Sequence, residues 1–258
     1  MSVIPSLLMS LSYLFCVATV MAQSVPDISK MFAAAQTFRA ELEEERALQT
    51  YLAILEKDPQ HYEALWNASM LYAIIGFRGT DASSQRAYFQ KAKDVAEKGI
   101  TLYPDKGHPY FVMAMAKGRM ANVVGVIRRI ELAHEIEDHI QRAITLMPDH
   151  APSWHIYGVW QSEVANVSRV ERMAARLISR GLPVGSADKA EEFLKKALEL
   201  DAESIMIRVD LAQHYVRSNR NEDAIAVLEE LLALDLPFQW EDDPGHLDTA
   251  RALLRRIR

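Results

Sequence analysis

A pattern of small and large residues recurs five times along the chain, and it limits the possible fold more than any other feature. In the first half of each copy, large and small residues occur at helical spacing. In the second half, Ala and an apolar residue recur at helical spacing, and the copy ends at a position that is often Pro. The first copy runs from Met31 through Ala35 and Phe38 to Tyr51 and Pro59. Small residues let two antiparallel helices approach closely, and large residues fill the space to the next pair. The pattern predicts an all-α stack of helix pairs.

The order of these residues resembles the tetratricopeptide repeat. We therefore expect a tetratricopeptide-like, right-handed helical solenoid of about five helix pairs, with inserted or lengthened helices and a C-terminal capping helix. A cap is needed to cover the last apolar surface. The expected repeat domain spans residues 23–258, with repeats at about 28–61, 62–106, 107–150, 151–204 and 205–238 and the cap at 244–257.

The spacing within the repeats predicts where the solenoid is lengthened. The second and third copies are about ten residues longer than a 34-residue repeat, and the fourth is about twenty residues longer. Successive copies stay in phase, so the added residues lie between the two helices of one repeat, and we expect both helices to share them. In the fourth copy, residues 166–178 predict an inserted amphipathic helix. We expect its apolar residues Val170, Met173 and Leu177 to be packed, with a membrane contact as the alternative because the other side is rich in arginine.

Residues 1–22 are apolar and uncharged, and they end in Val20-Met21-Ala22, with small residues where a signal peptidase cleaves. We expect a cleaved signal peptide and a periplasmic or secreted protein. The alternative is a membrane anchor formed by residues 3–22. The only cysteine, Cys16, lies in this segment, so the mature chain suits an oxidising compartment without disulfides. The net charge of -6 argues against a nucleic-acid partner.

The strongest resemblance to a catalytic motif is the segment His134-Glu135-Ile136-Glu137-Asp138-His139. A zinc peptidase places its two histidines at positions i and i+4 of one helix. Here the second histidine comes one position later, which turns it about 140° away from the first. The sequence has neither a phosphate-binding Gly-rich loop nor a Gly-x-Ser-x-Gly motif. We therefore predict that the protein is not an enzyme and has no cofactor or metal site.

The concave groove of the expected solenoid is the better candidate for binding. The first helix of each pair lines this groove, and the helical period assigns it a mainly apolar lining with few polar groups. Such a lining disfavours the capture of a peptide carboxylate, which uses several charged donors. Either the chain fills the groove itself, or an apolar ligand or amphipathic partner helix binds there with Arg119 as the polar anchor. The predicted lining residues are Trp66, Met70, Ile74, Phe111, Met115, Arg119, His155, Val159, Ser162, Met206, Val209 and Gln213.

The fourth repeat carries a more specific resemblance. His139-Ile140, Gly158-Val159-Trp160 and Glu171-Arg172, followed by Ala174-Ala175, resemble the regulator of microtubule dynamics family, and the similarity covers about residues 30–257. The resemblance implies a non-enzymatic tetratricopeptide-like protein. Members of this family are linked to microtubules or organelle contacts, and the repeat domain of one member is associated with phospholipid binding. Val170 stands where the family has an aromatic residue, which weakens the case for a shared contact there.

These observations predict a bacterial-type, exported relative of that family that acts as a non-catalytic scaffold for a protein partner or an amphipathic helix. The alternative is a binder or carrier of lipid, or of another apolar ligand, in the groove. Membrane contact would then be made through residues 166–178 or an uncleaved N-terminus.

Overall fold

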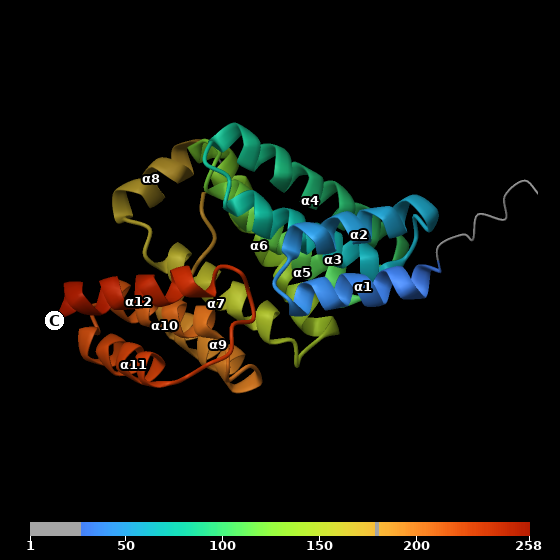
Figure 1. Cartoon of the computed structure of the whole chain (residues 1–258). Helices are drawn as coiled ribbons and strands as arrows, with labels where there is room; N and C mark the ends of the chain where they lie inside the picture. Colours follow the sequence, from blue (N-terminus) through green and yellow to red (C-terminus); the bar gives the residue numbers. More distant parts are fainter. Residues whose placement is uncertain (1–26, 179–180) are drawn as a thin grey trace, which may run out of the picture.

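The computed structural model describes residues 27–178 and 181–258, and every regular element in these ranges is an α-helix (Figure 1). The expected signal peptide, residues 1–22, lies outside the described residues. The helices are α1 (Ile28–Ala40), α2 (Glu44–Lys57), α3 (Tyr62–Phe77), α4 (Ala82–Leu102), α5 (Gly107–Ala121), α6 (Val126–Leu146), α7 (Ala151–Ala165), α8 (Arg169–Ile178), α9 (Ala187–Leu200), α10 (Ile205–Arg217), α11 (Asn221–Ala233) and α12 (Asp243–Ile257).

The helices pack as five pairs that follow one another along the chain. The pairs are α1 with α2, α3 with α4, α5 with α6, α7 with α9, and α10 with α11. Helix α8 is inserted inside the fourth pair, and α12 packs against the last pair as a cap (Figure 1). This arrangement confirms the prediction of an all-α, tetratricopeptide-like stack with an inserted helix and a terminal cap.

Small residues bring the paired helices together, as the repeat pattern predicts. A Cβ atom added to Gly158 of α7 would lie 2.7 Å from Cγ of Leu194 and 3.0 Å from its backbone nitrogen in α9. In the second pair, the hydroxyl of Ser69 donates a hydrogen bond of 2.8 Å to the carbonyl of Ala92. Such approaches leave no room for larger side chains, so the small positions set the distance between the helices.

The added length of the second and third pairs lies mainly in their second helices. Helices α4 and α6 have 21 residues each, compared with 14 in α2. Helices α3 and α5, with 16 and 15 residues, are only slightly longer than α1, with 13. Both helices therefore share the insertion, as expected, but the second helix takes most of it. Helix α4 buries a single stripe, Phe89, Ala92, Ala96 and Gly99, so it can extend into solvent without a new core.

The largest apolar cluster spans α3 to α7, and separate clusters lie under the first pair and under α9 to α12. In residues 27–178 and 181–258, no helix is both long and apolar enough to cross a bilayer.

Candidate functional site

The structure divides the predicted groove residues into two groups. One group is buried in the helix stack and contacts neighbouring helices; its members are Met70, Ile74, Phe111, His155, Ser162 and Val209. The other group is half-buried, and its members are Trp66, Met115, Arg119, Val159, Met206 and Gln213. Half of the residues that the helical period assigned to the groove are therefore part of the core. Whether the half-buried group binds a partner stays a prediction.

A segment between α11 and α12 covers part of this concave side. We call residues 238–243 the strap. Its Trp240 packs against the large apolar cluster of α3 to α7, and the guanidinium of Arg39 lies 4.0 Å from the centre of its ring. The carboxylate of Asp243 accepts hydrogen bonds from the backbone N–H groups of Gln239, at 2.7 Å, and Trp240, at 2.9 Å. This turn holds the indole in place.

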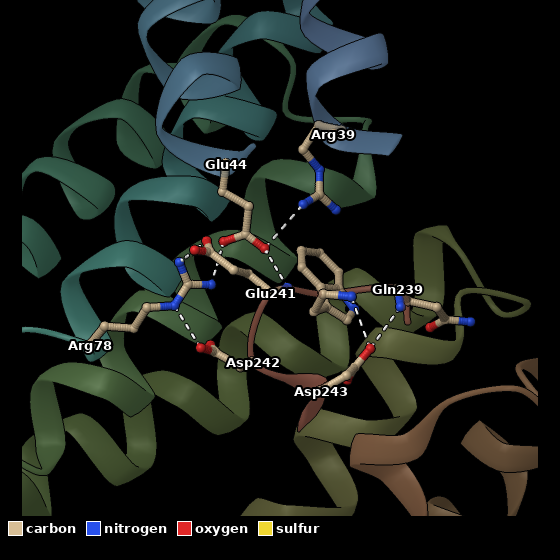
Figure 2. A network of polar contacts seen from close by, with 8 residues as sticks. Arg39, Glu44, Arg78, Gln239, Glu241, Asp242 and Asp243 are labelled. Carbon is tan, nitrogen blue, oxygen red and sulfur yellow. Dashed lines mark hydrogen bonds and ion pairs between the residues drawn. The ribbon is translucent and has the colours of Figure 1, made fainter. Parts of the chain in front are cut away.

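A network of side-chain ion pairs joins the strap to the first two helix pairs (Figure 2). Arg78, which caps α3, contacts three carboxylates at 2.6 Å each, those of Glu44, Glu241 and Asp242. The backbone N–H of Glu241 also donates a hydrogen bond of 3.3 Å to Glu44. Arg39 lies 3.5 Å from the other side of the Glu44 carboxylate. The network therefore ties the last helix of the chain to the first pair (Figure 1).

The surroundings oppose the charged form of Glu44 and favour the charged form of Arg78. Burial raises the pKa of Glu44, whose side chain is fully buried, and the positive charges of Arg78 and Arg39 offset only part of that rise. Burial also opposes the charge of Arg78, but the hydrogen bonds and charges of Asp242 and Glu44 together raise its pKa. The strap therefore stabilises the charged form of Arg78, which in turn is the main counter-ion of Glu44.

Arg119 is half-buried, and its guanidinium stacks 3.9 Å from the ring centre of Phe77. Burial lowers the pKa of Arg119, and the charges of Asp210, Asp242 and Glu163 oppose this effect. Asp210 in turn lies 2.7 Å from Nε2 of His155. The sequence predicted Arg119 alone as a polar anchor, whereas the structure places the negatively charged Asp210 near it as well.

Two cavities lie near the C-terminal helices. The larger has a volume of about 390 Å³ and is lined by α10 and α12, including Gln213, Arg217 and Arg256. The smaller, about 220 Å³, lies beside α11 and contains Phe238 of the strap.

The apolar face of α8 is exposed, which contradicts the expectation that it is packed. Val170, Met173 and Leu177 are 76%, 64% and 89% exposed, whereas Ala175 on the opposite side is 2% exposed. Arg172 anchors the helix by donating hydrogen bonds to the carbonyls of Val164, at 2.6 Å, and Pro183, at 2.9 Å. The small Ala175 and the polar Arg172 make the contacts with the solenoid, so the larger apolar residues point outward.

The first turn of α8 is also fixed by local hydrogen bonds. The carboxylate of Glu171 accepts from the backbone N–H and the hydroxyl of Ser168, and the N–H of Glu171 donates back to that hydroxyl. This is a capping box, which defines the start of a helix. Helix α8 also contacts α6, whose first turn exposes Val126 and Ile127.

The two histidines of the segment that resembles a zinc peptidase motif, His134 and His139, make structural contacts. Nε2 of His134 hydrogen-bonds to the carbonyl of Gly181 at 2.9 Å, and Nδ1 of His139 to the carbonyl of Glu135 at 2.5 Å. Within the described ranges, no three His, Cys, Asp or Glu side chains are grouped so that they could hold a metal ion.

Sequence reasoning missed the residues that form the strap network, namely Glu44, Arg78, Trp240, Glu241 and Asp242. Their positions are separated by up to 197 residues along the chain, and no local period joins them. A tryptophan between polar residues in a loop was the only signal, because an indole of this size is usually at least partly buried.

Comparison with solved structures supports the fold. The crystal structure of TTC0263, a thermophilic TPR protein in Thermus thermophilus, superposes with a TM-score of 0.65 at 19% identity, covering 89% of this chain and all of that one. At this level of identity the likeness shows the fold alone.

Comparison with known sequences identifies the family. Regulator of microtubule dynamics protein 3 of Xenopus laevis is 26% identical over 195 residues, which are 75% of this chain and 42% of the relative. Regulator of microtubule dynamics protein 2 of Rattus norvegicus is 24% identical over 189 residues, or 73% of this chain and 45% of the relative. The chain thus spans less than half the length of these relatives. The family model for regulator of microtubule dynamics protein 1-3 matches residues 31–258, and the chain therefore belongs to this family.

Proposed function

We propose that this protein is a non-catalytic scaffold that binds a partner protein through the exposed apolar face of α8. The observation that carries the proposal is the exposure of Val170, Met173 and Leu177 on a helix that Arg172 holds to the carbonyls of Val164 and Pro183. Clustered exposed apolar residues on a soluble protein usually mark a contact surface. A fixed helix also loses little conformational entropy when a partner binds.

The chemistry of the face defines the partner. Its three apolar residues follow the helical spacing that an amphipathic partner helix matches in a helix-to-groove contact. The exposed Arg169 and Arg176 flank them, so acidic residues at the edge of the partner helix would complement the charge.

A carrier of lipid in the concave groove has less support. Trp240 of the strap already packs on the apolar cluster of α3 to α7, and the larger cavity lies elsewhere, between α10 and α12, where polar Gln213, Arg217 and Arg256 stand beside apolar Val216 and Leu253. The strap would have to leave before an apolar ligand could take its place.

The test compares partner capture by the wild-type chain with capture by Met173→Glu/Leu177→Glu. Leu234→Glu is the matched control, because Leu234 is an exposed leucine, 42% exposed, at the end of α11. A partner captured by wild type and control is then purified and titrated against all three chains. We expect the α8 variant to lose at least about tenfold in affinity, as the loss of two apolar contacts implies.

Unchanged affinity of the α8 variant for every captured partner would rule out this surface. Flotation with vesicles that contain anionic phosphatidylserine tests the alternative that the apolar face of α8 binds a membrane. If the wild type but not the α8 variant binds these vesicles, and no protein partner depends on α8, the face is a membrane contact instead.

We also propose that the chain is exported, on the basis of the apolar, uncharged residues 1–22. The expected result is a mature protein that begins after Ala22 and is found outside the cytoplasm. N-terminal sequencing of the protein from fractionated cells measures both. A full-length chain in the membrane fraction would favour the anchor, and a full-length chain in the cytoplasm would contradict export.

A further inference from the structure

The strap is bound to the first two helix pairs in the manner of a peptide ligand. Three consecutive residues make the contacts: Trp240 packs on the apolar cluster and on Arg39, while Glu241 and Asp242 bind Arg78 (Figure 2). The backbone takes part as well, since the N–H of Glu241 donates to Glu44. An aromatic anchor, adjacent charged pairs and a main-chain hydrogen bond are the usual components of peptide recognition.

The surface under the strap has the charge and shape for such a ligand. We call Arg39, Glu44, Phe77, Arg78 and Arg119 the seat. Within the seat, the guanidinium groups of Arg39 and Arg78 face one carboxylate, that of the buried Glu44, while Arg119 stacks on Phe77. The charge of Arg119 is balanced partly by Asp242 of the strap and partly by Asp210 and Glu163 outside the seat. Without the strap, two arginines would share the single carboxylate of Glu44, so the occupant that pairs with Arg78 must be acidic.

We propose that the seat is a second protein-interaction site, which binds in trans an extended acidic segment with an aromatic residue followed directly by two carboxylate residues. The strap is the intramolecular occupant of this site. The inference does not depend on the role of α8, because the seat lies outside α8 and uses none of its residues.

The strap is suited to exchange with such a segment. It lies in the connection between α11 and α12, and only Asp243 belongs to a helix, so its departure does not require a helix to unfold. A tethered segment has an effective concentration on the order of millimolar. A partner therefore has to bind the free seat with micromolar or better affinity, or be held close by a second contact, to replace it.

The test uses a fluorescein-labelled peptide with the sequence of residues 237–245, PFQWEDDPG, and the full-length chain. In Asp242→Asn the strap loses its contact with Nε of Arg78, while the added peptide keeps its own aspartate. We expect this variant to bind the peptide about tenfold more tightly than the wild type does, because the internal competitor is weakened. Asp248→Asn, which removes an exposed carboxylate of α12, should bind the peptide as the wild type does.

Two further measurements show whether the peptide occupies the seat. Combining Asp242→Asn with Arg78→Gln should abolish binding, and so should replacing the three acids of the peptide by their amides. In the unmodified wild type, excess peptide should accelerate hydrogen exchange at the amides of Gln239 and Trp240, which donate to Asp243 in the folded strap. This measurement needs no variant and so decides the question even if Asp242→Asn does not fold.

The inference is overturned if folded Asp242→Asn does not bind the peptide at about millimolar concentration, or if the change at Arg78 leaves binding intact. Unchanged exchange at Gln239 and Trp240 in the wild type would also overturn it. None of these results bears on partner binding by α8, which the Met173→Glu/Leu177→Glu variant tests separately.

Discussion

At the scale of single residues, a half-buried histidine makes the stability of the fold sensitive to mild acid. His150 precedes α7, where its ring packs edge-on against Phe111, with ring centres 4.7 Å apart, and against His108 at 5.3 Å. Its Nδ1 lies 2.8 Å from the hydroxyl of Ser153. Burial, with a smaller contribution from the charge of His108, lowers the pKa of His150 to about 4. The folded chain therefore holds this imidazole in its neutral form.

The shift predicts a loss of stability on acidification. A histidine in an unfolded chain titrates near pH 6.5. Between about pH 6.5 and 4, His150 therefore binds a proton in the unfolded chain but stays neutral in the folded chain. The stabilisation is complete above this window and is lost as the pH falls through it. Urea unfolding at about pH 7.5, 6 and 4.5 should show a shallower decline for His150→Gln than for the wild type. Parallel declines would contradict the assignment.

At the scale of helix pairs, substitutions at two glycines distinguish the effect of helix packing on stability from the effect of backbone entropy. The Cβ of an alanine at position 158 would contact Leu194, including its backbone nitrogen, whereas an alanine at Gly118 of α5 would have no atom within 4 Å outside its own helix backbone and sequence neighbours. We expect Gly158→Ala to lower the free energy of unfolding by about 1–3 kcal/mol through overpacking. We expect Gly118→Ala to raise it by about 0.5–1 kcal/mol. Urea unfolding measures both, and equal signs would refute the explanation.

Helix α8 is attached to the solenoid by few contacts, and Arg172 supplies two of them. We expect Arg172→Ala to speed hydrogen exchange at the amides of α8, while the global free energy of unfolding changes by less than about 1 kcal/mol. Arg176→Ala is the matched control, because Arg176 is an exposed arginine on the same helix. Exchange that is equally fast in both variants would show that other contacts hold α8 in place.

At the scale of the whole molecule, the strap turns an open stack into a closed one. In an ordinary solenoid each repeat contacts only its neighbours, so the two ends are independent. Here Arg78 of the second pair binds Glu44 of the first pair and Asp242 beside the cap (Figure 2). The first pair and the C-terminal cap should therefore gain or lose stability together.

The change Trp240→Ala tests this coupling. We expect a loss of about 2–4 kcal/mol in the free energy of unfolding, because a large aromatic contact is removed, together with faster hydrogen exchange in α1 and α2. Trp154→Ala is the control: Trp154 is also half-buried, but its aromatic partner is Phe193 of α9, with ring centres 5.3 Å apart, and not a residue of the strap network. Exchange in α1 and α2 that is unaffected by Trp240→Ala would show that the two ends are independent.

The sequence by itself determined the helix pairs, the inserted helix and the cap, because helical period and small contact residues such as Gly158 are local properties. It could not separate core from surface along the first helices, since Phe111 follows the same period as the half-buried Met115 and is buried.

Only the tertiary structure decided the two candidate sites. An amphipathic pattern shows that Met173 and Leu177 share a face, yet whether a neighbour covers that face depends on how α8 is anchored. The strap network joins Arg78 to Asp242 across 164 residues, a pairing that no local pattern encodes. It forms because the folded stack brings a buried carboxylate, three arginines and an acidic loop to one place, where each charge needs the others.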